Sequence, residues 1–304
     1  MSFNSLMALL TRGTLDYLEA RPTVLELGNQ TLRASDEALR LIIERSAPGS
    51  TKEPVDIAGL QKLVAQGEKA RAERAADYYR LLGFSSYTAI DVNDLYGSLI
   101  MDLNKDLREA YGYKDTFSLV TNNGTGEHVF NQQTIYRNAH QLTKAGGIMI
   151  HSQPFIDYIN HGFYSIHPNL YHALAVANGY DILAMGVSTR DGYGIIALGG
   201  EALREQKTPI LAKETRVSLG VLLSSAKIGP RGPRGWLKLF AGNADGRRFG
   251  AEVRRLQRNS LKLMSFAILR KPTDSEFQIP IQTVYEPVVQ DDGLRSEYGL
   301  ESTT

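Results

Sequence analysis

The chain has 304 residues, of which 42% are hydrophobic and 22% charged, and its formal net charge at pH 7 is +1. This balance is typical of a globular protein with a sizeable core, and it provides no overall attraction to nucleic acid or to a membrane surface. The absence of cysteine excludes disulfides, thiolate nucleophiles and cysteine-bound zinc or iron–sulfur sites.

Apolar spacing predicts a helix over residues 4–20, which Arg21-Pro22 ends before a first strand that begins at Val24. More than fifty residues separate this strand from the next one, where a simple crossover needs about a dozen. We expect this insert to be helical. It contains one helix over residues 37–45 and, after the breaker at residues 47–50, a single long charged helix over residues 57–82.

Further stretches have the apolar pattern of strands: residues 87–92, 99–101, 117–120, 148–150, 181–187 and 261–269, with weaker candidates at 192–199 and 217–223. A helix is predicted over residues 132–144 and is ended by Gly146-Gly147. Strands that alternate with helices favour an α/β, Rossmann-like fold with a doubly wound, mostly parallel sheet.

The predicted organisation has an N-terminal helix over residues 1–21 and a cofactor-binding core over residues 22–200. Within the core, residues 32–82 form the helical insert, which we expect to act as a lid over the acceptor side. The remaining segments form a C-terminal extension: residues 201–304, with a basic insertion at 227–262 and a closing strand at 261–271. A solvated basic loop and helix is the simpler interpretation of the insertion, and a clamp for an anionic substrate or nucleic acid is the alternative.

Three of the predicted strands end in a glycine or an acid, at Gly28, Asp91 and Asp102. The carboxyl ends of parallel strands meet at one edge of an open α/β sheet, and this is the edge that holds ligands. Glycine lets the backbone come close to a ligand, and a carboxylate can accept bonds from both ribose hydroxyls. The sequence therefore predicts a site for a nucleoside-bearing cofactor.

A wider set of segments follows the same order as in one known family: residues 82–84, 87–93, 101–104, 120–131, 144–151, 160–164, 269–271 and 280–282. Among them is Asn122-Asn123-Gly124-Thr125-Gly126-Glu127-His128. In this order of motifs the chain resembles class I S-adenosylmethionine-dependent methyltransferases, in particular a bacterial branch with an Asn-x-Gly-Thr-x-Glu-His motif. The resemblance covers about residues 22–190 and the last strand.

The resemblance implies a seven-stranded sheet with an antiparallel last strand, which we place at residues 261–269 in preference to 217–223. It also implies S-adenosylmethionine as the cofactor. By position, Glu26, Gly28 and Asn29 would face the methionine part, Asp91 the ribose, Asp102 and Leu103 the adenine, and Asn122 and Gly124 the sulfonium. Asn93 is a further cofactor-binding candidate. The chain departs from the family after Gly28, because Asn29-Gln30-Thr31 stands where further glycines are usual and leaves the backbone less room to approach a ligand.

Candidate catalytic groups come from the histidines. Methylation of a hydroxyl or amine requires loss of a proton, so a positioned base and rigid orientation are the main contributions a protein can make. His128, His151 and His161 lie just past predicted strands or in a loop that reaches the same edge. A structural hydrogen bond is the competing interpretation for each. Candidates for the wall of an acceptor pocket are Phe155, Tyr158, Asn160 and Tyr164.

The other histidines are given structural roles. His140 lies in the middle of a predicted helix and is expected at the surface, while His167 and His172 flank a helix start where a cap is the simplest interpretation. The chain has no His-x-His pair, no His-x-x-x-His on one helix face and no cysteine, so we expect no bound metal.

The function predicted is biosynthetic: transfer of a methyl group from S-adenosylmethionine to an oxygen or nitrogen of a small metabolite, a secondary metabolite or a sugar-like compound. Two alternatives stay open, a non-methylating relative that catalyses a cyclisation or rearrangement and a non-catalytic methyltransferase-like partner subunit. The expected partner is a small-molecule acceptor, without membrane or nucleic acid, and homo-oligomerisation is left open. With no apolar run near ~18 residues and no signal-peptide pattern, we expect a cytoplasmic protein.

Overall fold

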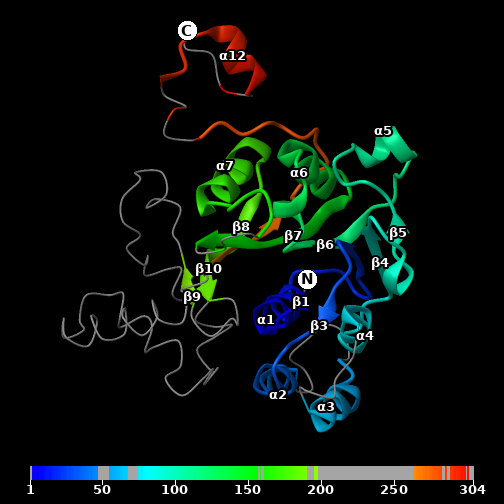
Figure 1. Cartoon of the computed structure of the whole chain (residues 1–304). Helices are drawn as coiled ribbons and strands as arrows, with labels where there is room; N and C mark the ends of the chain where they lie inside the picture. Colours follow the sequence, from blue (N-terminus) through cyan, green and yellow to red (C-terminus); the bar gives the residue numbers. More distant parts are fainter. Residues whose placement is uncertain are drawn as a thin grey trace, which may run out of the picture.

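The computed structural model describes residues 2–46, 55–67, 74–156, 158, 161–189, 195–197, 263–282, 285, 288–298 and 300. Within these residues, one twisted sheet of eight strands runs through the middle of the molecule and helices cover both of its faces (Figure 1). A separate pair of two-residue strands, β1 (Ser2–Phe3) and β3 (Thr31–Leu32), joins the N-terminus to the segment after the first long strand.

The strands of the large sheet are β2 (Thr23–Leu27), β4 (Ser86–Asp91), β5 (Leu99–Ile100), β6 (Phe117–Asn123), β7 (Thr143–Ile156), β8 (Asp181–Thr189), β9 (Ile195–Ala197) and β10 (Leu263–Arg270). Their order is β5-β4-β2-β6-β7-β10-β8-β9. Neighbours from β5 to β7 pair in parallel, and β10 is antiparallel to both β7 and β8. The doubly wound sheet with an antiparallel last strand is confirmed, and β9 adds an eighth short strand at the edge.

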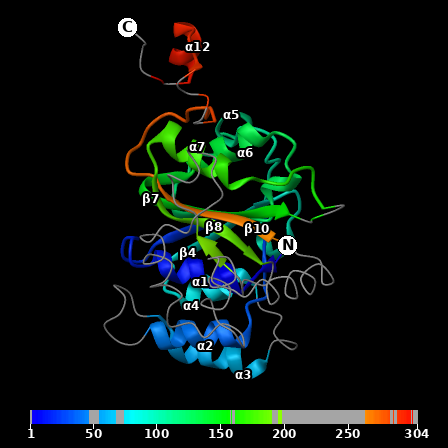
Figure 2. The ribbon, with the colours of Figure 1, turned by 90° about the vertical axis from the view of Figure 1, so that its left-hand side faces the viewer.

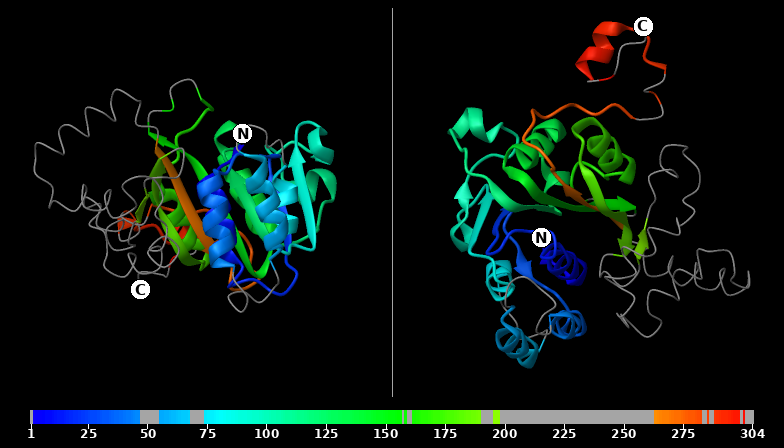
Figure 3. Two further views of the ribbon diagram at one scale, coloured as in Figure 1. Left: turned by 90° about the horizontal axis from the view of Figure 1, so that it is seen from below. Right: turned by 180° about the vertical axis from the view of Figure 1, so that it is seen from behind.

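Four helices sandwich the sheet. On one face lie α1 (Ser5–Thr14) and α4 (Ala75–Leu81), and on the other lie α6 (Gln132–Gln141) and α7 (Pro168–Asn178) (Figure 3). Two shorter helices, α5 (Leu107–Tyr111) and α12 (Asp292–Glu297), lie outside this sandwich. An apolar core lies on each face of the sheet, because successive side chains of a strand point to opposite faces. In β7, Ile148 and Ile150 pack toward α1, and Met149 packs toward α6 and α7.

The first helix is shorter than predicted. It begins after Asn4, whose side chain caps the Met7 N–H at 3.0 Å, and it ends at Thr14 instead of residue 20. There the Leu15 N–H turns back to the Arg12 carbonyl at 3.3 Å, which is a tightened last turn. All ten residues of α1 are buried, because the sheet covers one side of the helix and α2 (Asp36–Arg45) contacts it as well.

The prediction of a single helix over residues 57–82 is wrong. The structure has two helices, α3 (Ile57–Gln66) and α4, and α3 ends at Gly67, whose φ of +74° interrupts a right-handed helix. The described part of the insert forms an outer layer, in which α2 packs on α1 and α3 packs on α4 (Figure 2). A lid role for the insert stays a prediction.

The insert leaves and rejoins the core at the tip of β2. Thr31 forms a bridge with Arg74, and the Ala75 N–H donates to the Gln30 carbonyl at 3.3 Å. The alternative closing strand at residues 217–223 and the basic insertion at 227–262 lie outside the described residues. Of the helices that the structure describes, none has the length and apolarity to cross a bilayer.

Candidate functional site

The three strand tips singled out in the sequence meet at the carboxyl edge of the sheet. The Gly28 N–H donates to the Ile90 carbonyl at 2.7 Å, and the Met101 N–H donates to the Asp91 carbonyl at 3.0 Å. These bonds bring Gly28, Asp91 and the residue before Asp102 next to one another. The expected cofactor edge is thus a continuous strip formed by the ends of β2, β4 and β5.

The Asp91 carboxylate is already bonded within the chain. Its Oδ2 accepts the Asn29 N–H at 3.0 Å, and its Oδ1 accepts the Val92 N–H at 2.7 Å and the Asn93 amide at 2.9 Å. An ionised carboxylate offers about four acceptor directions. Three of them are occupied by protein donors, which leaves one direction on Oδ2 for a ribose hydroxyl.

The Asn29 side chain holds the loop that follows Asp91. Its amide donates to Asn93 Oδ1 at 3.3 Å, to the Leu95 carbonyl at 3.3 Å and to Ser98 Oγ at 3.1 Å. The same loop contains Tyr96, one of the few non-glycine residues with a positive φ, at +60°. Asn29 therefore ties the tip of β2 to the loop after β4.

Gln30 lies across the tips of β2 and β6. Its buried amide donates to the Gly28 carbonyl at 3.3 Å and to the Asn123 carbonyl at 3.0 Å. The methionine part of the cofactor is expected beside Gly28, and the sulfonium beside Asn122 and Gly124. These two bonds tie the Gln30 side chain to the strand tips where the methionine part and the sulfonium are expected.

Contacts within the chain explain why residue 28 is a glycine. Its φ is +85°, and a Cβ there would lie 2.1 Å from Thr125 Oγ1 and 2.8 Å from Thr125 Cγ2. Both the backbone conformation and the packing of Thr125 require the absence of a side chain. Close approach of a ligand is not needed to explain this residue.

Glu26 is a buried residue of β2. Its carboxyl is buried on the α4 face of the sheet, where the Tyr87 hydroxyl donates to Oε2 at 2.6 Å. Burial raises the pKa of Glu26 to about 8, which keeps the carboxyl protonated at neutral pH. Contact between Glu26 and the methionine part of the cofactor, as the resemblance implies, stays a prediction.

The remaining residues expected to contact the cofactor are Asp102, Leu103, Asn122 and Gly124. Asp102 is partly exposed and accepts the Asn104 N–H at 2.9 Å and its amide at 3.0 Å, bonds that lower the pKa of Asp102. Leu103 is buried in the core beneath α6. Asn122 Oδ1 caps the Gly126 N–H at 2.8 Å, and the Gly124 N–H donates to the Ser152 carbonyl at 2.7 Å.

His151 is a core residue. The prediction ended the strand at residue 150, whereas β7 continues to Ile156, so His151 lies within the strand between the rings of Tyr136 and Tyr171. The Asn122 amide approaches its Nδ1 at 3.4 Å, and burial lowers the pKa of His151 to about 3. The imidazole stays neutral, and the buried position supports a structural role better than contact with an acceptor.

A cluster that the sequence analysis did not assemble lies at the end of β6. Glu127, which is fully buried, has its Oε1 3.8 Å from His128 Nε2 and 3.4 Å from His161 Nε2. The two imidazoles are about half exposed, with side-chain exposures of 45% and 38%. Burial raises the pKa of Glu127 to about 7, and burial together with His161 lowers the pKa of His128.

Sequence spacing could not reveal this cluster. His128 comes from the short 3-10 turn η2 (Gly126–His128), and His161 comes from a loop more than thirty residues later. The one feature of the sequence that points to the cluster is Glu127, a carboxyl residue directly before His128 in the segment after β6.

Aromatic side chains surround the cluster. The ring of Tyr158 lies 5.3 Å from that of His161, and the Tyr164 hydroxyl donates to the Phe130 carbonyl at 2.9 Å. Phe130 and Phe163 pack edge to face and remain largely exposed. Of the other acceptor candidates, Phe155 packs on His167 instead. Asn160 lies outside the described residues.

The prediction that His140 lies at the surface is wrong. The segment after β10 covers it, and Phe277 packs against its ring at 5.7 Å. Its Nε2 donates to the Ser275 carbonyl and its Nδ1 accepts the Tyr180 hydroxyl, both at 2.6 Å. Burial lowers the pKa of His140 to about 4, in keeping with a neutral ring bonded on both sides. His167 does cap α7, through its Nδ1 and the Asn169 N–H.

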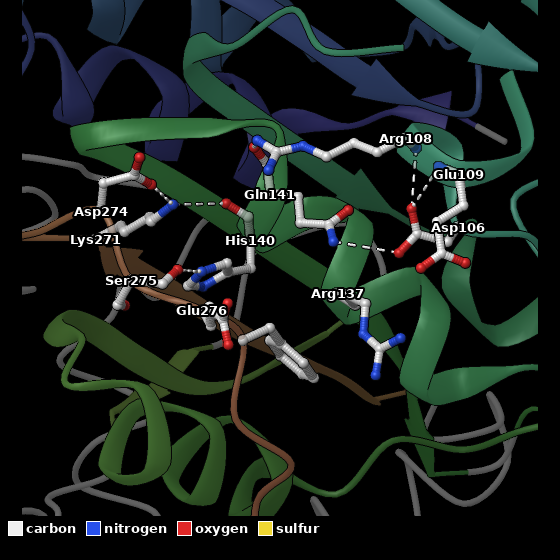
Figure 4. Close-up of a pocket in the computed structure, with 11 residues that line it drawn as sticks. Asp106, Arg108, Glu109, Arg137, His140, Gln141, Lys271, Asp274, Ser275 and Glu276 are labelled. Atoms are coloured by element: carbon white, nitrogen blue, oxygen red, sulfur yellow. Dashed lines mark hydrogen bonds and ion pairs between the residues drawn. The ribbon is translucent and has the colours of Figure 1, made fainter. Parts of the chain in front are cut away.

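A cleft of about 510 Å³ lies at the opposite, amino edge of the parallel strands (Figure 4). The ammonium of Lys271 is buried there and donates to the His140 carbonyl, the Thr143 carbonyl and Asp274. These three acceptors satisfy the charge, so Lys271 ties α6 to the end of β10. The cleft is remote from the strand tips that carry the candidate site.

Comparison with known proteins finds distant structural neighbours. No model of a known protein family matches the sequence, and no curated protein matches it. Distantly similar solved structures include a coclaurine N-methyltransferase bound to N-methylheliamine and SAH, at 12% identity over 88% of this chain and 72% of the other, with a TM-score of 0.38. A phosphoethanolamine N-methyltransferase 2 from Haemonchus contortus, in complex with S-adenosyl-L-methionine, has 12% identity over 88% and 52%, with a TM-score of 0.35. The cyclase SpnF has 12% identity over 88% and 80%, with a TM-score of 0.35.

Proposed function

We propose that this chain is a class I S-adenosylmethionine-dependent methyltransferase that acts on an oxygen or nitrogen of a small metabolite, of the secondary-metabolite or sugar-like kind. The observation that carries the proposal is the meeting of Gly28, Asp91 and Asp102 at the carboxyl edge of a doubly wound sheet. Ligands of such sheets bind at this edge. The motif order over residues 82–164 supports the same cofactor.

Each part of the edge has a distinct role in this proposal. Asp91 would accept a ribose hydroxyl through the one free direction on Oδ2, and the cofactor would take the place of the Gln30 amide between β2 and β6. When bound, the cofactor supplies an electrophilic methyl group. The chain's own residues orient the two reactants, because the transfer needs an in-line approach.

The acceptor side is best matched by the end of β6. His128 and His161 are exposed there and lie among aromatic side chains, whereas His151 is enclosed by the core. We therefore place the acceptor beside His128 and His161 and give His151 a structural role, as a hydrogen-bond partner of Asn122.

Binding of S-adenosylhomocysteine tests the cofactor site. The Asp91→Ala variant removes the ribose acceptor, and we expect its affinity to fall at least about tenfold, which corresponds to about 1.4 kcal/mol. Isothermal titration calorimetry on the full chain measures it. The matched control is Asp94→Ala, which removes a nearby exposed carboxylate and should leave affinity unchanged. Equal affinities of wild type and Asp91→Ala would remove Asp91 from the site.

A specific observation favours a second candidate, a methyltransferase-like subunit without catalytic activity. The internal bonds of Asn29 and Gln30 already satisfy the strand tips. In such a subunit these side chains would be permanent substitutes for a cofactor. Absence of any heat with wild-type chain and millimolar S-adenosylhomocysteine would support this candidate over the methyltransferase.

A further inference from the structure

We propose that Glu127, His128 and His161 bind one divalent transition-metal ion. One carboxylate oxygen and two imidazole nitrogens from these residues all lie within 4.8 Å of one another. The inference concerns a metal at the acceptor side and stands apart from the cofactor edge, so it can hold whether or not the chain transfers methyl groups.

The separations between the ligand atoms fit a metal. Bonds of about 2.0–2.1 Å at tetrahedral angles place two ligand atoms about 3.3 Å apart. Glu127 Oε1 is 3.4 Å from His161 Nε2 and 3.8 Å from His128 Nε2. The first distance already matches, and the second requires only a small rotation of a half-exposed imidazole.

The state of the Glu127 carboxyl points to a missing ligand. The side chain is fully buried, and neither oxygen has a hydrogen-bond donor in bonding geometry among the residues that the structure describes. The nearby amide nitrogen of Gln153 makes no hydrogen bond either. The polar neighbours of this buried carboxyl are the two imidazoles and the Gln153 amide, none in hydrogen-bonding geometry. Such burial costs free energy, and a cation held with the two imidazoles would offset that cost.

Backbone hydrogen bonds hold the three residues in this geometry without a metal. The Glu127 carbonyl accepts the Phe163 N–H at 2.7 Å and the Tyr164 N–H at 3.3 Å, which fixes the loop after His161 against η2. Gly162 lies between His161 and Phe163 in the sequence. Its φ is +68°, and a Cβ there would stand 2.9 Å from the Glu127 carbonyl oxygen. The two histidines are thus brought together by backbone contacts that do not depend on a metal.

The donor set indicates the class of ion. Two imidazoles and one carboxylate suit zinc and the later first-row metals, whereas Mg²⁺ and Ca²⁺ prefer oxygen ligands. Three protein ligands leave positions open, as in catalytic metal sites, and the exposed imidazoles give access from solvent. An oxygen ligand at an open position, such as a hydroxyl group, would have its pKa lowered. If the proposed function also holds, this favours a hydroxyl acceptor over an amine.

Direct metal binding tests the inference without cofactor or substrate. The full chain, treated with chelator and dialysed, is titrated with Co²⁺ by visible absorption and with Zn²⁺ by calorimetry. We expect one ion per chain and a higher melting temperature with Zn²⁺. Glu127→Gln and His161→Ala should each weaken binding by at least about a hundredfold.

The matched control is His167→Asn. It removes an exposed imidazole that is not part of the cluster, and it keeps a side chain able to cap α7. This variant should bind the metal like the wild type. His161→Ala changes a half-exposed loop residue, so its fold should persist, and a circular dichroism spectrum like that of the wild type verifies this. Absence of Co²⁺ absorption and Zn²⁺ heat at millimolar metal, or tight binding that survives both Glu127→Gln and His161→Ala, would overturn the inference.

Discussion

Replacing Gly28 by alanine is expected to lower the free energy of unfolding by about 2–4 kcal/mol. Two effects add. A side chain at a φ of +85° is strained, by about 1–2 kcal/mol, and the new methyl group would overlap the Thr125 side chain, with Oγ1 only 2.1 Å away. Urea unfolding followed by circular dichroism measures the loss, which follows from contacts within the chain.

Two further variants separate these effects. Gly179→Ala has the same kind of backbone, with a φ of +64°, but nothing lies within 4 Å of its Cβ, so we expect a loss of about 1 kcal/mol. In a Thr125→Ala background, Gly28→Ala should cost less than in the wild type, because the overlapping atoms are gone. Equal costs in both backgrounds would show that Thr125 is not what excludes a side chain at Gly28.

The second large effect is a pH dependence of stability that originates in Glu26. Its pKa is raised from 4.5 to about 8 in the folded chain, because burial disfavours the charged form by more than the hydrogen bonds of Tyr87 and Tyr79 favour it. The stabilising contribution of this group is therefore fully present below about pH 4.5. It is lost as the pH rises through about 8, by about 1.4 kcal/mol for each pH unit of that window.

Glu26→Gln should remove this contribution, since glutamine stays neutral and can still accept the Tyr87 hydroxyl. We expect the free energy of unfolding of the variant to increase relative to that of the wild type as the pH rises from 5 to 8, by a few kcal/mol in all. Other titrating groups are common to both proteins and cancel in the difference between the two unfolding free energies. A difference that stays constant across this range would contradict a buried, protonated Glu26.

The fold was largely predictable because strands that are buried on both faces of a sheet form nearly continuous apolar runs. Residues 24–27 and 148–150 are such runs, and glycine marks the ends of several elements. The exceptions have local causes. The break at Gly67 depends on a positive φ that a charged helical pattern does not display, and the burial of His140 depends on a segment more than 130 residues away.

The candidate site was predictable only in part. Acids and glycine at strand ends located the edge, since all carboxyl ends of parallel strands fall on one side. The internal bonds of Asn29 and Gln30 could not be foreseen, because they depend on side-chain reach between strands that are distant in sequence. The same holds for Glu127 and His161, which are brought together by two backbone hydrogen bonds after folding.

The most direct test of the central claim is a crystal structure of the full chain soaked with S-adenosylhomocysteine. Occupancy of the strand tips by this ligand would support it, with a ribose hydroxyl on Asp91 Oδ2 and the Gln30 amide displaced from the Gly28 and Asn123 carbonyls. Difference density that is empty there, with Asn29 and Gln30 still in their internal bonds at saturating ligand, would contradict the claim.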